Sequence, residues 1–386
     1  MKATFRRRKY ILQLALGMPR VYSGLDHLMV ETTKYATSLG YTNVCVYTDT
    51  MEYMPQLQED IEEAGGVVEL VRRSNYLTDI WRLYCKYRPV VVDTHFVNKV
   101  KLWTCIFSLL FGARHFTHIH SQIGPDVKDY VQQKGYIKRF LLGIYYWILG
   151  IRSEKILCVS DLNRLQYLEW SYGAKQKVET LYMGTQIHEP KYKKIEARNI
   201  LNLPQDKRII TNVSAIEHIK GIDLIIKGLA LLKQKGIDVL FAHLGGLRGE
   251  TIEQQQYADS LKQMARELGV EENVVWLGRR NDISDVLSFA DCYVHPSLTE
   301  GLPSALMEAA MAGLPLIATR AGGMPEIVQH GVNGLLVDAD NAEQLANTIE
   351  QVLASKNNYG EHAKAIVYQT FDQSRLAIEL MQIYEL

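Results

Sequence analysis

Residues 299–315 read Thr-Glu-Gly-Leu-Pro-Ser-Ala-Leu-Met-Glu-Ala-Ala-Met-Ala-Gly-Leu-Pro, an apolar segment that carries two carboxylates, Glu300 and Glu308. Pro303 is typical of the first turn of a helix, and Gly313, with a proline two residues later, marks a helix end. Because almost every side chain between these marks is apolar, we expect a short helix that is buried on nearly all sides. An ionised carboxylate buried there without polar partners costs several kcal/mol. We therefore expect Glu308 either to bind a ligand with paired hydroxyl groups or to be paired within the core.

Short apolar runs alternate with helix-length amphipathic segments along the chain, which is typical of parallel βα units. The pattern predicts an α/β protein with two doubly wound, Rossmann-like domains. Helical patterns include 26–39, 77–86 and 138–149. Strands are expected at 10–16, 43–47, 67–70, 90–92, 115–120, 155–159, 178–182, 208–213, 239–244, 274–277, 292–295, 316–319 and 334–337.

The stretch 184–198 has no apolar period, and we interpret it as the linker between the two domains. The N-terminal domain is expected at 1–187 and the C-terminal domain at 188–372. The last segment, 373–386, is amphipathic. It should pack back on the first domain, because a terminal helix needs an apolar surface to cover.

The composition is that of an ordinary globular protein, with 386 residues, 47% apolar and 22% charged. The net charge is zero, but residues 1–190 carry 24 Lys and Arg against 18 Asp and Glu, whereas the remainder carries 19 against 25. A neutral chain with an acidic C-terminal half does not have the charge of a nucleic-acid binder.

The cysteines and the apolar stretches indicate the expected compartment. The five cysteines are odd in number and lack metal-ligand spacing, so we expect buried free thiols in a reducing compartment. The basic run 6–9 precedes an apolar run that is typical of a first strand rather than of a signal peptide. The longest apolar stretches, 102–111 and 140–149, are too short to cross a bilayer. A cytoplasmic location is therefore expected.

Loops after the predicted strands carry the candidate ligand contacts, because ligands bind at the carboxyl ends of parallel strands. The loop after 292–295 holds Glu300, and the amides at Ser304 would form a helix N-terminus suited to a phosphate. The loop that begins at Ser214 ends in Lys220, which is placed to reach a phosphate as a point charge. The alternative for Lys220 is a solvated lysine, although a cation there opposes the helix dipole.

Three further features of the sequence are weaker indications of ligand contacts than Glu300 and Lys220. The glycines of 316–326 should let the backbone approach neighbouring loops closely, a mainly structural role. The segment from Gly17 to Gly24 follows the first strand but lacks Gly-x-Gly-x-x-Gly, which argues against NAD binding. His118 and His120 share one side of a strand, and His120 lies nearer its carboxyl end. Such a histidine is either a ligand contact or a satisfied core residue.

These residues together resemble the GT4 family of GT-B glycosyltransferases, whose signature is Glu-x7-Glu, here Glu300 and Glu308. The resemblance covers the second domain well and the first loosely. The other matched motifs lie at 296–301, 308–315, 322–327 and 331–336.

The resemblance implies a GT-B enzyme whose two domains face each other across a crevice. It implies transfer of a sugar from a nucleotide-sugar, a UDP- or GDP-sugar, to a glycan or lipid-linked acceptor. The expected reaction retains the anomeric configuration and uses no metal and no cofactor. Cell-surface polysaccharide synthesis is the setting that the family suggests.

The resemblance also implies roles for individual residues. The expected catalytic residues are Glu300 and His120, which would lie beside the donor sugar, and Lys220, which would neutralise the leaving diphosphate. Glu308 is expected to bind the ribose hydroxyl groups, and Arg279 to border the base. The remaining donor-binding positions are Gly301, Leu302, Pro303, Ser304, Ser214 and Gly24.

Two departures from the family keep other functions open. Ala215 stands where the family often has an arginine, and Ser23 replaces the first glycine of a Gly-Gly pair. A catalytically weak nucleotide-sugar-binding partner subunit is therefore an alternative, as is a phosphorylase or epimerase on the same fold. Asp338-Ala-Asp340 is interpreted as part of a helix cap ahead of Asn341 rather than as a metal site.

Membrane contact is a separate question. The basic residues Arg6–Lys9, Lys134, Lys138 and Arg139 lie before the apolar stretch 140–149. One interpretation of this combination is peripheral contact with an anionic membrane, at its inner face. A buried helix preceded by a solvated extension is the alternative.

Overall fold

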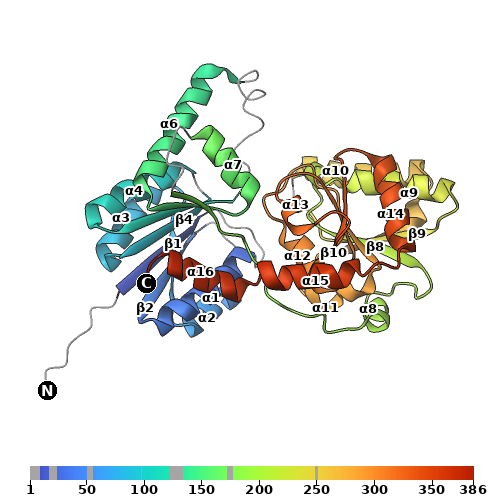
Figure 1. The fold of residues 1–386 in the computed structure, drawn as a ribbon, viewed down its shortest axis with the longest axis horizontal. Coiled ribbons are helices and arrows are strands. Elements are labelled where there is room, and N and C mark those ends of the chain that lie inside the picture. Colours follow the sequence, from blue (N-terminus) through green and yellow to red (C-terminus); the bar gives the residue numbers. More distant parts are fainter. Residues whose placement is uncertain are drawn as a thin grey trace. The chain divides into compact units, whose positions relative to one another are not determined.

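The structure is a computed structural model that describes residues 9–16, 24–49, 55–96, 98–120, 134–171, 177–247 and 251–386. The chain divides into two compact units, each with its own parallel sheet and flanking helices (Figure 1). Unit 1 comprises Met1–Gln186 and Asp372–Leu386, and unit 2 comprises Ile187–Phe371.

Unit 1 contains a seven-stranded parallel sheet in the order β3-β2-β1-β4-β5-β6-β7. Its strands are β1 Lys9–Leu16, β2 Tyr41–Thr48, β3 Val67–Val71, β4 Val91–Phe96, β5 Arg114–Ile119, β6 Lys155–Cys158 and β7 Val178–Thr180. Its main helices are α1 Gly24–Ser38, α2 Pro55–Glu63, α3 Tyr76–Tyr87, α4 Asn98–Phe111, α6 Tyr136–Arg152, α7 Asp161–Trp170 and α16 Gln373–Ile383.

Alternate residues of β1 face two separate helical layers, as the period of a strand requires. Ile11 and Ala15 belong to the core with α1 and α16, whereas Leu12 and Leu14 belong to the core with α3 and α4. Burial on both faces explains why this strand reads as a continuous apolar run.

The C-terminal helix α16 is part of unit 1. Leu376, Leu380 and Tyr384 are fully or almost fully buried in the same core as α1. A bridge between Thr185 and Asp372 brings the chain back to this unit. The prediction that the last segment packs back on the first domain is therefore confirmed, and its apolar face lies against α1.

Unit 2 repeats the arrangement with six parallel strands in the order β10-β9-β8-β11-β12-β13. Its strands are β8 Arg208–Val213, β9 Val239–Leu244, β10 Val274–Gly278, β11 Cys292–His295, β12 Leu316–Thr319 and β13 Gly334–Val337. Its helices are α8 Lys194–Ile200, α9 Ile222–Gln234, α10 Ile252–Glu267, α11 Ile283–Val286, α12 Ser304–Met311, α13 Met324–Ile327, α14 Ala342–Ala354 and α15 Tyr359–Thr370, with the short 3-10 turns η2 His218–Lys220, η3 Glu271–Asn273 and η4 Leu287–Phe289.

The predicted fold class of two doubly wound α/β domains is confirmed, and every predicted strand overlaps an observed one. Both sheets reverse their strand order once, at β1/β4 in unit 1 and at β8/β11 in unit 2. Such switch points are where open parallel sheets bind ligands. The topology therefore directs attention to the loops after β8 and β11.

Interpreting all of 184–198 as a linker was wrong. Helix α8 begins inside this stretch, and the guanidinium of Arg198 is buried. It donates to the carbonyl of Phe289 at 2.8 Å and pairs with Asp291 at 3.0 Å. Because a charged side chain occupies the buried face of this helix, the segment shows no apolar period.

Two smaller expectations also needed correction. Pro303 is the N-cap of α12 rather than a residue of its first turn. Cys85 is exposed, whereas the other four cysteines are buried free thiols, as expected.

Helix α6 is not a buried helix. Tyr136 and Ile137 are 81% and 77% exposed, and Leu141 is exposed as well. Arg139, in contrast, is buried and donates to the carbonyls of Glu169 and Trp170, so it does not contribute a surface charge. Arg6–Arg8 of the basic run lie outside the described residues. Within the described part of the chain, no helix has the length and apolar character needed to cross a membrane.

Candidate functional site

The loops that follow β8 and β11 are in close contact at the switch point of unit 2. The amide of Leu298 donates to the carbonyl of Ile219 at 2.8 Å. Gly221 has φ +67°, and a Cβ atom there would lie 2.3 Å from the carbonyl oxygen of Pro296. Only glycine tolerates both the backbone conformation and this approach. The contact positions Lys220, the preceding residue, beside the β11 loop.

The carboxylate of Glu300 is the centre of a charged cluster. Its Oε1 atom lies 2.5 Å from the Lys220 ammonium and 3.2 Å from Nε2 of His295, and it accepts a hydrogen bond from the Ser297 hydroxyl at 3.0 Å. The side chains of Lys220 and Glu300 are each only 14% exposed. Burial raises the pKa of Glu300, but His295 and Lys220 outweigh this effect and lower it to about 2. Glu300 is therefore ionised at any physiological pH.

The loop after β12 fixes the backbone of Glu300. Gly322 has φ +58°, and a Cβ atom there would lie 1.9 Å from the carbonyl oxygen of Glu300. The amide of Gly323 donates to the carbonyl of Gly301 at 2.9 Å. The expectation that glycines of this loop allow a close backbone approach is confirmed.

Helix α12 starts directly after Glu300, Gly301 and Leu302. Its N-cap residue is Pro303, whose side chain offers no hydrogen bond to the first-turn amides. These amides, beginning at Ser304, and the positive end of the helix dipole therefore favour an anion at this position.

Glu308 lies one turn further along α12, between the buried residues Met307 and Ala309. Within the described residues, no hydrogen bond or ion pair to its half-buried carboxylate is found. Burial raises its pKa. The protein thus holds a desolvated carboxylate whose polar partners have to come from outside the described chain.

Ser214 and Arg279 lie at the ends of β8 and β10, on the same edge of the sheet. The Ser214 hydroxyl donates to the side-chain oxygen of Asn212 at 2.7 Å. Arg279 is exposed, and its guanidinium donates to the carbonyl of Leu247. The structure therefore brings Ser214, Lys220, Arg279, Glu300 and the start of α12 to one edge of unit 2.

Two predicted site residues lie in unit 1 instead. Gly24 is the first residue of α1, and Ser23 lies outside the described residues. His120 directly follows β5, and its Nε2 atom lies 2.7 Å from Nδ1 of His95. Burial and then the neighbouring His95 and His118 rings lower its pKa well below the usual value.

Sequence reasoning missed several residues around the predicted ones. His295 and Ser297 surround Glu300, and Asp93 and His95 lie beside His120. In both places the polar residues are two positions apart on or directly after a strand. An alternation of polar side chains at the carboxyl end of an apolar strand is the signal that points to them.

Three histidines of unit 1 form a group that could hold a metal ion. One nitrogen of each of His95, His118 and His120 lies within 4.8 Å of the others. The sequence pattern places only His118 and His120 on one side of a strand, and no metal was predicted from it.

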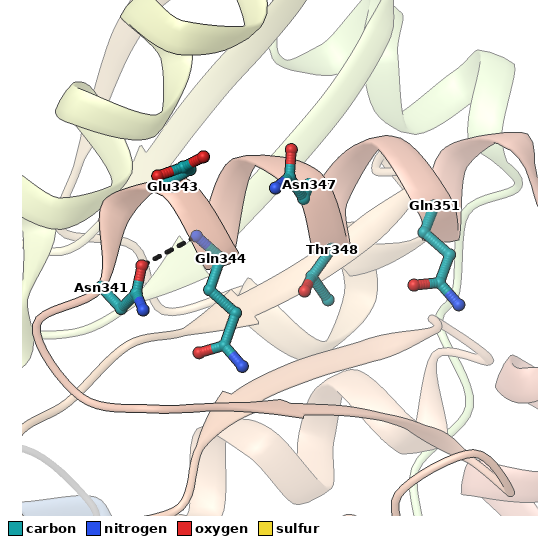
Figure 2. Close-up of a pocket in the computed structure, with 6 residues that line it drawn as sticks. All are labelled: Asn341, Glu343, Gln344, Asn347, Thr348 and Gln351. Atoms are coloured by element: carbon teal, nitrogen blue, oxygen red, sulfur yellow. Dashed lines mark hydrogen bonds between the residues drawn. The ribbon is translucent and has the colours of Figure 1, made fainter.

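Helix α14 carries a shallow polar hollow on one face, formed by Asn341, Glu343, Gln344, Asn347, Thr348 and Gln351 (Figure 2). Asn341 is the N-cap, and its side-chain oxygen accepts a hydrogen bond from the amide of Gln344 at 2.9 Å. The helix is thus capped by Asn341 itself, and Asp338 contributes its backbone amide, which donates to the Gln344 side chain at 2.7 Å. The hollow contains none of the predicted site residues.

Comparisons with known proteins agree with this geometry. Residues 193–371 match the family model described as glycosyl transferases group 1. A D-inositol 3-phosphate glycosyltransferase of Mycolicibacterium smegmatis is 35% identical over 52% of this chain and 45% of its own length. An N-acetyl-alpha-D-glucosaminyl L-malate synthase of Bacillus anthracis is 30% identical over 32% of this chain and 34% of its own length. The chain thus spans about half or less of the length of these two curated relatives.

Solved structures resemble the whole chain. The Anabaena protein HepE in complex with UDP has a TM-score of 0.81 at 19% identity, over 98% of this chain and 99% of that protein. WaaG, a glycosyltransferase involved in lipopolysaccharide biosynthesis, has a TM-score of 0.67 at 17% identity, over 97% of this chain and 99% of that protein. These likenesses confirm the predicted GT-B fold class.

Proposed function

We propose that this chain, whose residues 193–371 belong to the glycosyl transferases group 1 family, is a retaining glycosyltransferase that uses a nucleotide-sugar donor. One observation carries the proposal. A buried lysine–glutamate pair, the start of α12 and a desolvated carboxylate without a partner among the described residues lie together at the switch point of a doubly wound domain. Each matches one part of a nucleotide-sugar.

Glu308 suits the ribose of the donor. Two neighbouring hydroxyl groups can donate to the two oxygens of one carboxylate, and such charge-assisted hydrogen bonds are about twice as strong as neutral ones. The donor would also replace the solvation that Glu308 has lost by burial. Among the described residues Glu308 has no partner in the core. This supports binding of a ligand by Glu308 over pairing within the core.

Lys220 and the start of α12 suit the diphosphate. The ammonium has three protons, one of which is directed to Glu300. The others can bond to phosphate oxygens, together with the amides of Gly301 and of the first turn of α12. As the bond between the anomeric carbon and the diphosphate breaks, negative charge develops on the phosphate. Preorganised donors stabilise that charge by several kcal/mol.

Glu300 is better placed to bind the sugar than to attack it. Its Oε1 atom is engaged by Lys220, His295 and Ser297, and its low pKa makes it a weak nucleophile. We therefore favour front-face transfer, in which the leaving phosphate accepts the proton of the acceptor hydroxyl. Because the cations that this step needs are present in the protein, we also propose that no metal is required.

The experiment compares transfer or donor hydrolysis by Lys220→Ala with that by Lys227→Ala. Lys227 is a matched control, since its side chain is 43% exposed and pairs with Asp223 within α9. A thermal-shift screen with UDP-, GDP- and ADP-sugars selects the donor, starting with UDP-glucose because HepE was crystallised with it. Loss of at least about 100-fold only in Lys220→Ala supports the proposal. Equal rates in the two variants contradict it, and loss of activity in EDTA contradicts metal independence.

The acceptor is proposed to be a glycan or a lipid-linked molecule, bound by unit 1, in cell-surface polysaccharide synthesis. The exposed Tyr136, Ile137 and Leu141 of α6 lie near the exposed Lys134 and Lys138. Such a surface favours peripheral contact with anionic lipid at the cytoplasmic face of a membrane. Sedimentation with anionic vesicles at low salt tests this, and a protein that stays in the supernatant rules it out.

The second candidate function is a nucleotide-sugar-binding partner subunit. The observation in its favour is Ala215, which removes one cation expected beside the diphosphate. Calorimetry combined with activity assays separates the two, because this alternative requires donor binding without turnover in any acceptor mixture.

A further inference from the structure

Polar side chains alternate at the carboxyl end of β11, beside the loop that carries Glu300. Tyr293 and His295 belong to β11, and Ser297 follows two residues later. All three side chains are at most 2% exposed. A buried polar side chain costs free energy unless it is hydrogen-bonded, so the partners of these three groups indicate what they are for.

Tyr293 fixes the ring of His295. The hydroxyl of Tyr293 accepts a hydrogen bond from the amide of Val213 and donates to its carbonyl, each at 3.3 Å, at the end of β8. The same hydroxyl lies 3.3 Å from Nδ1 of His295. The two rings stack with an angle of 17° between their planes. With Nδ1 and one face of the ring engaged, the imidazole has one orientation, which directs Nε2 toward Glu300.

Three donors converge on one oxygen of Glu300. Nε2 of His295 lies 3.2 Å from Oε1. The Ser297 hydroxyl donates to the same atom at 3.0 Å, and the Lys220 ammonium donates to it at 2.5 Å. Nε2 of His295 also lies 3.3 Å from the Ser297 hydroxyl, so the strand supplies two donors that hold each other in place. A carboxylate oxygen has about two lone pairs, which leaves no acceptor capacity on Oε1 for a ligand.

The second oxygen of Glu300 is different. Within the described part of the chain, no hydrogen bond or ion pair reaches Oε2. The side chain is 14% exposed, and Oε2 is not one of the enclosed polar atoms that lack a partner. One oxygen of Glu300 is thus anchored to the protein, and the other is open to a ligand.

We propose that His295 is a positioning residue that, together with Ser297, holds Oε1 of Glu300 and so directs Oε2 at a hydroxyl group of the donor sugar. This inference rests on the proposed function and deepens it. Recognition of the sugar would depend on a histidine outside the Glu-x7-Glu motif. Because its ring is almost fully buried, His295 acts through Glu300 and not by contact with the donor.

Lys220 alone would not hold the carboxylate, because its ammonium also has to serve the diphosphate and sits on a flexible four-carbon stem. The donors from β11 have no such second task. A carboxylate that is already oriented loses less side-chain entropy when it binds a hydroxyl group, which is the advantage of preorganisation.

The test is calorimetry of the full-length protein with UDP and with UDP-glucose, or with GDP and GDP-glucose if the donor screen selects guanine. The ratio of the two dissociation constants isolates the contribution of the sugar, because both ligands share the nucleotide. In His295→Leu this ratio should shift against the sugar by at least about 10-fold, since a hydrogen bond to a charged group is altered. The affinity for the nucleotide alone should change little, because Lys220 and the start of α12 are unaltered.

His295→Gln is the matched control. Its side-chain amide can place an N–H donor near the position of Nε2, so it should keep most of the wild-type ratio. A merely structural role predicts the opposite pattern, in which both ligands lose affinity together in His295→Leu and glutamine does not restore the ratio. That pattern overturns the proposal.

Thermal unfolding establishes that each variant is folded. If His295→Leu does not fold, Ser297→Ala removes only one hydroxyl group and should shift the ratio in the same direction. An unchanged ratio in a folded His295→Leu, or in Ser297→Ala where His295→Leu does not fold, overturns the inference and leaves the proposed function standing. A wild type that binds neither the nucleotide nor its sugar contradicts the proposed function, and the inference falls with it.

Discussion

The ammonium of Lys220 lies 2.5 Å from Oε1 of Glu300, although 80 residues separate the two along the chain. The pair connects the loops after β8 and β11 at the switch point of unit 2. Glu300 thus holds Lys220 in place near the start of α12, where no side chain caps the first amides. A cation and a set of amide donors are thus already oriented for an anionic ligand.

Acid should weaken unit 2 through Glu300. The pKa of this carboxyl is about 2 in the folded protein, against 4.5 as its ordinary value. A depressed folded pKa contributes stability that is present above pH 4.5 and is lost as the pH falls toward 2. The contribution is on the order of 3 kcal/mol. Urea unfolding of the wild type and of Glu300→Gln as a function of pH measures it, and parallel curves for the two proteins would show that the prediction is wrong.

Glu308→Gln should separate stability from binding. Because burial raises the pKa of Glu308, its ionised form destabilises the folded state as the pH rises through that pKa. The neutral amide should therefore keep or raise Tm at neutral pH. The affinity for UDP should fall by about 10- to 100-fold, because charged hydrogen bonds contribute about 1.5–3 kcal/mol. Thermal unfolding and calorimetry measure the two effects. A lower Tm with unchanged affinity would place the partners of Glu308 in the core.

Gly221→Ala should cost more stability than Gly236→Ala. Both glycines have a positive φ, +67° and +77°, so both substitutions carry a backbone strain of roughly 1 kcal/mol. Only at Gly221 would the added Cβ collide with a backbone atom, the carbonyl oxygen of Pro296 at 2.3 Å. Gly221→Ala should also displace Lys220 and slow sugar transfer. Chemical denaturation of both variants makes the comparison, and equal losses would mean that the loop contact is unimportant.

Arg198 should be more important for folding than Lys194, although both pair with Asp291. The Arg198 side chain is 4% exposed and that of Lys194 is 45% exposed. Asp291 keeps Lys194 as a partner in Arg198→Ala, but the carbonyl of Phe289 loses its buried donor, and a buried group left without its partner costs about 1–3 kcal/mol. An exposed pair contributes about 0–1 kcal/mol. Urea unfolding of Arg198→Ala and Lys194→Ala should therefore differ clearly. Similar values would contradict the burial of the guanidinium.

The sequence predicted the strands well because strands of a parallel sheet are covered on both faces and read as uninterrupted apolar runs. Strands β8, β9, β11, β12 and β13 match the predicted ranges. Prediction failed where a buried side chain is polar. Arg198 hides the pattern of α8, and Asp93 and His95 interrupt the apolar run of β4.

The motif formed by Glu300 and Glu308 could be identified from the sequence because both residues lie in one continuous segment, a loop followed by a helix. The sequence by itself thus determined the two α/β domains, the strand positions and the residues of the Glu-x7-Glu motif. The tertiary structure alone decided that Lys220 meets Glu300, that His295 and Ser297 join them, and that Tyr384 reaches Asp93 from 291 residues away. Periodicity records which face of an element is buried. Which side chains then meet depends on strand order and on how loops pack, and these arise only when the whole chain has folded.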